Sequence, residues 1–263
     1  MSALIEVQGL TCGYGNRTIL KDVSFSIERG EVVAILGGSG CGKSTLLKHL
    51  IGLYSPQAGS IRIAGNELVG TIGEGREAIL RHLGAMFQAG ALFGSMSVLD
   101  NVMLPLQSFS QLDAPAIEII ARLKLRLVGL EAFADYAPAE LSGGMQKRAA
   151  IARAMALEPE ILFLDEPSAG LDPLTSAELD ALIRRIAETQ HVTCVLVSHE
   201  LASIHAIADR AIMLDRSTQG IIAIDTPQAL AQSSDERVNR FFNRGQLRLV
   251  PHNCAASEPT LQG

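Results

Sequence analysis

The chain has 263 residues, of which 48% are hydrophobic and 19% are charged, and its formal net charge is −6. This much apolar surface is enough for a sizeable core and excludes an intrinsically disordered protein. The acidic balance excludes the basic face that non-specific binding to DNA or RNA requires, so nucleic acid is not an expected partner.

The cysteines and the apolar runs narrow the class of protein further. Cys12, Cys41, Cys194 and Cys254 are widely separated and form no C-x-x-C pair, which argues against a zinc site and against a secreted disulfide framework. Met1–Leu10 has no basic region followed by an apolar stretch, so no signal peptide is expected. No apolar run approaches the roughly 18 to 20 residues of a spanning helix. We therefore expect a protein of a reducing cytosol that does not cross a membrane.

The first thirty residues predict antiparallel strands. Leu4–Val7 and Val23–Ile27 alternate apolar and polar residues, and a Gly-Tyr-Gly-Asn turn near Tyr14 lies between them. The next segment differs, because Val32–Leu36 is continuously apolar and leads into a helical pattern at Ser44–Gly52. A strand of this kind is typical of a parallel sheet that is buried on both faces.

Helical patterns dominate the middle of the chain, and the strand pattern disappears between about Ala89 and Ala156. The helical stretches include Ser97–Leu106 and Ala114–Val128. An inserted helical subdomain of about residues 89–156 is the simplest interpretation. Leu123–Val128 also alternates like a strand, and periodicity leaves both structures open for that segment.

Two further strand-to-helix units follow. Ile161–Leu164 leads into Leu174–Glu188, for which Asp172 is the predicted N-cap, and Thr193–Val197 leads into Leu201–Ala208. Continuous apolar strands separated by helices indicate an α/β fold with a mainly parallel sheet covered on both faces, beside an N-terminal antiparallel β subdomain.

A phosphate-binding motif lies between the first buried strand and its helix. Gly37–Ser44 matches G-x-x-x-x-G-K-[ST], and a plain glycine-rich turn would not need the Lys-Ser pair in this register. The glycines allow backbone N–H groups to approach phosphates, and the helix N-terminus favours their charge. Lys43 is expected to reach the β and γ phosphates, and the Ser44 hydroxyl to ligate Mg²⁺. The residues expected to hold the nucleotide are Gly37, Gly38, Ser39, Gly40, Cys41, Gly42, Lys43, Ser44 and Thr45.

Two acids follow the strand Ile161–Leu164, as in a strand whose carboxyl end faces a nucleotide crevice. Asp165 is expected to hold Mg²⁺, and Glu166 to polarise the attacking water as general base. The alternative is a solvated acidic turn at Pro167. The phosphate-binding motif favours the chemical interpretation.

A second glycine-rich turn, Leu141-Ser142-Gly143-Gly144-Met145, extends these motifs into a family pattern. The phosphate loop, this turn, Leu164–Pro167 and His199 occur in the order and spacing of ABC-transporter ATPase subunits, so the chain resembles that family from Leu4 to about Phe242. The resemblance implies a P-loop NTPase core and an ABC ATPase domain over residues 1–243, followed by a tail over residues 244–263. It also implies ATP and Mg²⁺ as ligands.

In this family the second turn reaches the nucleotide of another subunit. The resemblance implies that Ser142, Gly143 and Gly144 cap a helix beginning near Met145 and direct its positive end at the γ-phosphate held by a second copy, in agreement with anion binding at helix N-termini. Ser142 is by itself an ordinary helix cap, and both roles are compatible. The family usually has Gln at the position of Met145. The resemblance therefore does not imply the polar contact that this glutamine makes beside the nucleotide.

Four further positions match the family one by one. Tyr14 matches the aromatic residue that stacks on adenine, Gln88 the glutamine that contacts Mg²⁺ or water and senses the membrane partner, and Asp172 the aspartate of the loop between the two sites. His199 matches the histidine that touches the γ-phosphate, in a catalytic set with Glu166 and Lys43. Each also has a plain structural interpretation, as a turn residue, an exposed hinge residue, an N-cap or a structural histidine.

A metalloprotease interpretation fails on spacing. His199-Glu200 begins like H-E-x-x-H, but the second histidine position is occupied by Ser203.

One segment points to a narrower group. Phe87–Phe93 and Val98–Leu106 resemble the ATPases of Mce-associated lipid transporters, including the Mla phospholipid-trafficking type of Gram-negative bacteria. This implies an integral-membrane permease, a periplasmic Mce-domain lipid carrier and a small STAS-domain regulator as partners, with the chain peripheral on the cytoplasmic face of the inner membrane. Arg244–Gly263, with two prolines and no periodicity, is expected to be mobile or to reach the partner ATPase.

The apolar stretch Ala89–Leu106 is a candidate docking surface for the permease, or else part of the core of the helical subdomain. Its apolar residues include Leu92, Phe93, Met96, Val98 and Met103.

The leading hypothesis is a transport ATPase that dimerises around two Mg-ATP and drives a permease, with phospholipid as the expected cargo. A nutrient importer or another ABC exporter is the alternative. A soluble ABC protein acting on ribosomes or DNA would carry paired cassettes, a long coiled coil or a basic surface, and the sequence has none of these. A P-loop metabolite kinase would not explain Leu141–Gly144.

Overall fold

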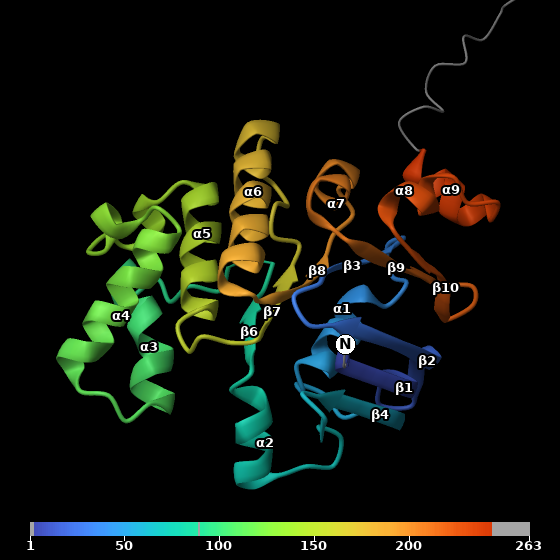
Figure 1. Ribbon diagram of the computed structural model, residues 1–263, viewed down its shortest axis with the longest axis horizontal. Helices are drawn as coiled ribbons and strands as arrows, with labels where there is room; N and C mark the ends of the chain where they lie inside the picture. The colour runs from blue at the N-terminus through green and yellow to red at the C-terminus, as the bar shows by residue number, and fades with distance from the viewer. Residues whose placement is uncertain (1–2, 89, 244–263) are drawn as a thin grey trace, which may run out of the picture.

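The structure, a computed structural model, describes residues 3–88 and 90–243. It contains a six-stranded sheet and a four-stranded sheet, with helices grouped mainly on one side of the larger sheet (Figure 1). The expectation for the tail Arg244–Gly263 falls outside the described residues, as does the structure of Ala89.

The six-stranded sheet has the order β10-β9-β3-β8-β7-β6. All neighbouring pairs from β9 to β6 are parallel, and only β10 pairs antiparallel with β9. The predicted mainly parallel sheet is therefore confirmed. Its strands are β3 (Val32–Gly37), β6 (Leu83–Met86), β7 (Ile161–Asp165), β8 (Thr193–Val197), β9 (Arg210–Asp215) and β10 (Gly220–Asp225).

The N-terminal strands form a separate antiparallel sheet, with the order β2-β1-β4-β5. This confirms the predicted antiparallel β subdomain, although the alternating patterns identified only part of each long strand and missed β4 and β5. The four strands are β1 (Ala3–Tyr14), β2 (Arg17–Glu28), β4 (Ala58–Ile63) and β5 (Asn66–Glu67).

Nine α-helices lie within the described ranges, and five of them match predicted helices closely. In chain order, the nine within the described ranges are α1 (Lys43–Leu50), α2 (Gly73–Leu80), α3 (Val98–Phe109), α4 (Ala114–Leu127), α5 (Gly143–Ala154), α6 (Pro173–Gln190), α7 (Leu201–Ile207), α8 (Pro227–Ala231) and α9 (Glu236–Phe242), with 3-10 turns at Glu131–Phe133 and Pro138–Glu140. Helix α5 agrees with the helix expected to begin near Met145, and the other three, α2, α8 and α9, have five to eight residues and were not predicted.

The central strands β3, β7 and β8 are buried along their whole length because both faces of the sheet are covered. Alternate residues belong to two different cores, as the two-residue period of a strand requires. Val33 and Ile35 pack in the core shared with α1 and the antiparallel sheet, whereas Ala34 and Leu36 pack in the core shared with the helices above the sheet. Figure 1 shows α6 and α7 on one side and β1, β2 and β4 on the other.

The segment between β6 and β7 contains α3, α4 and α5 and no strand among its described residues, although β6 and β7 are direct neighbours in the sheet. This confirms the predicted helical insert. Leu123–Val128 is helical up to Leu127, which settles the alternative left open by periodicity. Lys124 and Leu125 are buried while Leu123 is exposed, so the segment presents one helical face to the core.

Of the residues in the candidate docking stretch, Val98 follows the alternative interpretation, since it is completely buried in the core of the helical insert. Leu92 and Met103 are partly buried and pack against the same core, because α3 packs on α4 and α5. Phe93 remains exposed over 51% of its surface.

None of the helices within residues 3–88 and 90–243 has the length and apolar character needed to span a membrane.

The start of α3 depends on one completely buried amide side chain. Asn101 accepts a hydrogen bond of 2.8 Å from the backbone N–H of Phe93 and donates to the carbonyls of Phe93 and Ser97 at 3.1 and 2.9 Å. These bonds hold the irregular stretch before α3 against the first turn of the helix.

Asn101→Ala should therefore lower the free energy of unfolding by about 2 kcal/mol and the Tm by about 4–8 °C, because it leaves buried backbone groups without partners. Thermal melting of the purified chain measures the change. The control is Gln107→Ala, a change of an exposed amide on the same helix, which should leave the Tm nearly unchanged. Equal Tm values for the two variants would contradict this account of Asn101.

Candidate active site

The phosphate loop follows β3 and opens α1, as its motif predicts. Gly37 has a φ of 142°, and a Cβ there would lie 2.4 Å from the Leu214 carbonyl oxygen. Gly42 has a φ of 107° and forms the left-handed N-cap of α1. Glycine is needed at both positions, since side chains would clash or strain the backbone. The loop therefore keeps the tight path that brings N–H groups toward a bound anion.

Lys43 lies over this loop. Its ammonium donates to the Gly37 and Gly38 carbonyls at 2.9 and 3.3 Å. Cys41 is buried, and burial raises the pKa of its thiol. The expected set of residues 37–45 is thus a contiguous strand-loop-helix unit, with Ser44 exposed at the start of α1.

Asp165 ends β7 on the same edge of the sheet. Val197 of β8 pairs with Ile35 of β3 on one side and with Asp165 of β7 on the other. Gly37 is the last residue of β3 and Asp165 is the last residue of β7, so both lie at the same edge of the sheet. Asp165 is 8% exposed, and its Oδ1 has no hydrogen-bond partner within the described ranges. Burial raises the pKa of this carboxyl, the charge of Glu166 raises it further, and nearby lysines oppose the shift.

An unpartnered buried carboxylate oxygen fits a divalent cation, because the cation would satisfy its lone pairs and remove the cost of its burial. No group of three or more His, Cys, Asp or Glu side chains in residues 3–88 and 90–243 forms a cage that could hold a metal by itself. Mg²⁺ bound through one or two protein oxygens together with phosphates is consistent with this arrangement.

Glu166 and His199 are in direct contact, which the sequence did not predict. His199 Nδ1 and Glu166 Oε1 are 2.9 Å apart. Glu166 also has a left-handed backbone, with φ of 50°, and its N–H donates to the Val197 carbonyl at 2.9 Å. Non-glycine residues adopt this conformation at a cost and do so preferentially at functional sites.

Tyr14 lies beside the start of α1. Its hydroxyl is 3.4 Å from Thr45 Oγ1, and its ring makes a T-shaped contact with Tyr54 at 5.4 Å. The ring of Tyr14 remains 42% exposed, so one face is available for stacking. Tyr54 had no signal in the sequence, because a single aromatic after a helix is usually a core residue.

The second glycine-rich turn forms the N-terminus of α5. Ser142 is the N-cap and accepts a hydrogen bond of 3.3 Å from the Met145 N–H, and the helix begins at Gly143, two residues before the expected start near Met145. A Cβ on Gly144 would lie 2.4 Å from Thr175 Cγ2, so only glycine permits this approach of α5 to α6. Met145 is half-buried and packs against the core.

Asp172 caps α6, as predicted. Its carboxylate accepts from the N–H groups of Leu174 and Thr175 at 3.1 Å and from the Thr175 hydroxyl at 2.6 Å. The hydrogen bond from Thr175 is the main reason that the pKa of this carboxyl lies below its usual value.

Gln88 follows β6 and is exposed. Together with Gly143, Lys147 and Gly170 it lines a hollow of about 430 Å³ beside the N-terminus of α5. No hydrogen bond connects residues 37–45 with residues 141–145 in the part of the chain that the structure describes. The lining of this hollow includes Gly143 of the second turn and no residue of the phosphate loop.

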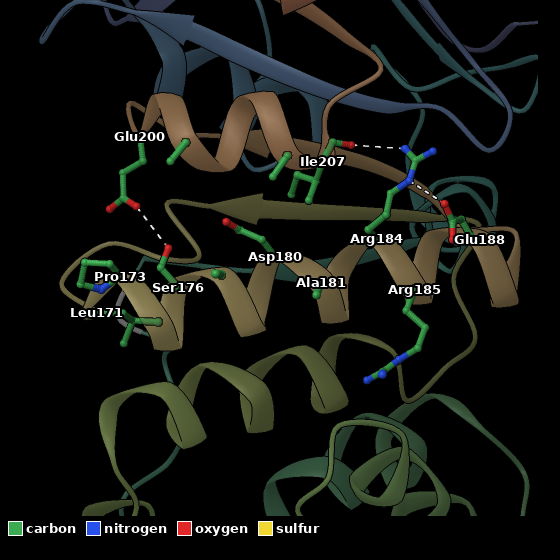
Figure 2. A pocket seen from close by; sticks show the side chains of 13 residues that line it. Leu171, Pro173, Ser176, Asp180, Ala181, Arg184, Arg185, Glu188, Glu200 and Ile207 are labelled. Carbon is green, nitrogen blue, oxygen red and sulfur yellow. Dashed lines mark hydrogen bonds and ion pairs between the residues drawn. The ribbon is translucent and has the colours of Figure 1, made fainter. Parts of the chain in front are cut away.

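A larger hollow, of about 850 Å³, lies between α6 and α7 and includes no residue of the phosphate loop (Figure 2). Asp180 lies at its floor, where burial raises the pKa of the carboxyl, and Ser176 donates to Glu200 at 3.4 Å. The size of a hollow therefore does not locate the chemistry, which lies at the carboxyl edge of the sheet.

Comparison with known proteins agrees with this site. The family model described as "ABC transporter" matches residues 20–169. The intermembrane phospholipid transport system ATP-binding protein MlaF of Escherichia coli K12 is 39% identical over 240 residues, which cover 91% of this chain and 88% of MlaF. The probable ribonucleotide transport ATP-binding protein mkl of Mycobacterium leprae is 40% identical over 246 residues, covering 94% of this chain and 70% of mkl.

A solved structure supports the fold. The dimeric ATP-binding cassette MJ0796, in a post-hydrolysis state bound to ADP and Pi, superposes with a TM-score of 0.76 at 30% identity, covering 85% of this chain and 98% of that one. The phosphate loop, the acidic strand end and the family match lead to one conclusion. This chain belongs to the ABC transporter family and is an ATP-binding ABC transporter ATPase.

Proposed function

We propose that this chain hydrolyses Mg-ATP as a dimer on the cytoplasmic face of the inner membrane and drives a permease that moves phospholipids between the inner and outer membranes. The observation that carries the proposal is the meeting of the phosphate loop, the unpartnered Asp165 oxygen and the Glu166–His199 contact at one edge of the parallel sheet. Residues 1–243 act as the ABC ATPase domain, with the insert at about 89–156 serving the second nucleotide.

The proposed roles follow from position. Lys43 is already directed along the phosphate loop and exchanges its carbonyl partners for phosphate oxygens when ATP enters. Tyr14 stacks on the adenine with its exposed face. Ser44, Asp165 and Gln88 would hold Mg²⁺, which would neutralise phosphate charge when bound.

Glu166 accepts the proton of the attacking water, and His199 fixes the orientation of the Glu166 carboxylate through their 2.9 Å contact. His199 has a second ring nitrogen for the γ-phosphate. The left-handed backbone of Glu166 aims this side chain away from the direction of the strand, which a residue continuing β7 would not achieve.

The dimer is supported by the N-terminus of α5. Ser142 and Gly143 are exposed there, and a helix N-terminus is an anion site. A second copy places its γ-phosphate there, with Asp172 in the loop between the two sites. The dimeric state of the similar MJ0796 cassette with ADP and Pi supports this arrangement.

The membrane partner docks beside the insert. A mostly apolar groove of about 210 Å³ lies next to α2 and the end of α3, and Phe109 contributes an exposed ring to it. An integral-membrane permease is the proposed occupant, accompanied by an Mce-domain lipid carrier and a STAS-domain regulator. The match to MlaF over 88% of its length supports phospholipid as cargo, whereas the match to mkl spans 70% of that protein.

Lys43→Ala should weaken ATP binding about 10- to 100-fold, because charge-assisted hydrogen bonds to phosphate contribute about 1.5–3 kcal/mol. Titration with a fluorescent ATP analogue measures the Kd. Lys21→Ala, which changes an exposed lysine on β2, is the control and should leave the Kd unchanged. An unaltered Kd in Lys43→Ala would refute its role in the phosphate loop.

Glu166→Gln should lower kcat by about 100-fold or more while ATP still binds, since the amide cannot accept the proton of water. The variant should accumulate as an ATP-bound dimer on size-exclusion chromatography. Glu118→Gln, a matched change of an exposed residue on α4, should keep full turnover. Hydrolysis at the wild-type rate by Glu166→Gln would show that another group is the base.

The cargo is tested on the membrane complex purified through a tag on this chain. Phospholipid supplied in nanodiscs should raise its ATPase rate, and ribonucleotides should not. The Glu166→Gln complex is the control for contaminating ATPases. Stimulation by ribonucleotides without any response to phospholipid would favour the alternative of a nutrient importer.

A further inference from the structure

Lys147, in the second turn of α5, buries an ammonium group beside the catalytic residues. The residue is 9% exposed, and no carboxylate forms an ion pair with it within residues 3–88 and 90–243. Its Nζ donates to the backbone carbonyl of Gln88 and, at 3.5 Å, to that of Glu166. Burial lowers the pKa of Lys147, whereas the charges of Asp165 and Glu166 raise it.

The Glu166 carbonyl belongs to the left-handed residue of the site. Three other bonds hold this residue: its N–H donates to Val197 at 2.9 Å, its carbonyl accepts from Ala169 at 3.3 Å, and its carboxylate contacts His199. A conformation of this kind persists only where the surroundings over-determine it. Among the described residues, the bond from Lys147 is the only bond to Glu166 that comes from the helical insert.

The other acceptor connects the same ammonium to Gln88. Arg153, two turns further along α5, donates to the Gly90 and Ala91 carbonyls at 2.9 and 2.7 Å. The stretch that follows β6 is therefore attached to α5 at two points. A shift of α5 relative to the sheet changes the distance from Lys147 to Glu166 and the position of Gln88 together.

We propose that Lys147 is a positioning residue that couples the placement of α5, and so the engagement of Ser142–Gly144 with the partner's nucleotide, to the backbone of Glu166 in its own site. This inference rests on the proposed function as an ATP-hydrolysing dimer. It makes each site responsive to ATP at the other one, without any contact between Lys147 and the substrate.

The test compares the full-length Lys147→Met variant with the full-length wild-type chain. Methionine has a similar length and removes the donors and the charge. The variant removes the cost of burying a charge, the Glu166 carbonyl keeps its bond from the Ala169 N–H, and Gln88 is exposed to water, so the Tm should stay within about 3 °C. The kcat should fall about 2- to 30-fold, the range of coupling effects, with less change in the KM for ATP. The Hill coefficient for ATP should fall toward one.

Two further variants separate positioning from packing. Lys147→Arg keeps a cation with donors and should restore most of the kcat and of the Hill coefficient. Lys124→Met makes the same change at a lysine of α4 that is equally buried, at 7% exposure, and is bonded to Glu158 at 3.0 Å, away from Gln88 and Glu166. It should leave the kcat and Hill coefficient at wild-type values.

The inference is overturned if Lys147→Met keeps the wild-type kcat and Hill coefficient, or loses no more activity than Lys124→Met. It is also overturned if Lys147→Arg is as impaired as Lys147→Met while both remain folded. If Lys147→Met does not fold, Lys147→Arg alone decides, because retained activity and cooperativity support the proposal and their loss overturns it. Failure of the wild-type chain to hydrolyse ATP would instead contradict the proposed function itself.

Discussion

The parallel pairing of β3, β8 and β7 determines where the chemistry lies. Parallel strands end at the same edge of a sheet, so the residues after β3, at the end of β7 and after β8 meet although they are far apart in the chain. Such a sheet is stable only when both faces are covered. The antiparallel sheet with α1 covers one face, and the helices from α5 onward cover the other, so these strands are buried along their length and the acidic pair lies at a strand end.

Close contacts of two glycines determine the position of the helical insert. Gly144 at the start of α5 allows contact with Thr175 on α6, and a Cβ on Gly84 in β6 would lie 2.3 Å from the Ala154 carbonyl oxygen at the end of the same helix. Helix α5 is thus in close contact with the core at both ends. Packed interfaces resist gradual deformation, and the coupling proposed for Lys147 depends on this close packing of α5.

The phosphate loop, the buried strands and the helix caps Ser142 and Asp172 could be predicted from the sequence, because each depends on local residue types. The parallel topology and the helical insert also followed from the order of apolar runs. Short strands such as β5 and β6 could not be predicted, since their pairing depends on partners distant in the chain.

The contacts inside the site were beyond the reach of sequence patterns. The Glu166–His199 contact requires the β7–β8 register and the left-handed backbone of Glu166, neither of which leaves a local signal. Lys147 lies in a helix whose pattern gives no reason to expect a buried cation. The sequence leaves the apolar stretch before and within α3 open between a docking surface and a core, and only the fold places Val98 in the core.

The carboxyl edge gathers several features that each reduce stability. Within the described residues, Glu166 has an unfavourable backbone conformation, Asp165 has a buried oxygen without a partner, and Lys147 has a buried charge without a carboxylate. Such features also occur singly elsewhere in the chain, so it is their position at the edge that carries the phosphate loop that indicates a function. Bound phosphates and a divalent cation would reverse the balance, because a cation favours the ionised form of Asp165 that burial opposes. Under the proposed function, Mg-ATP would therefore gain binding free energy at this edge by giving these groups partners.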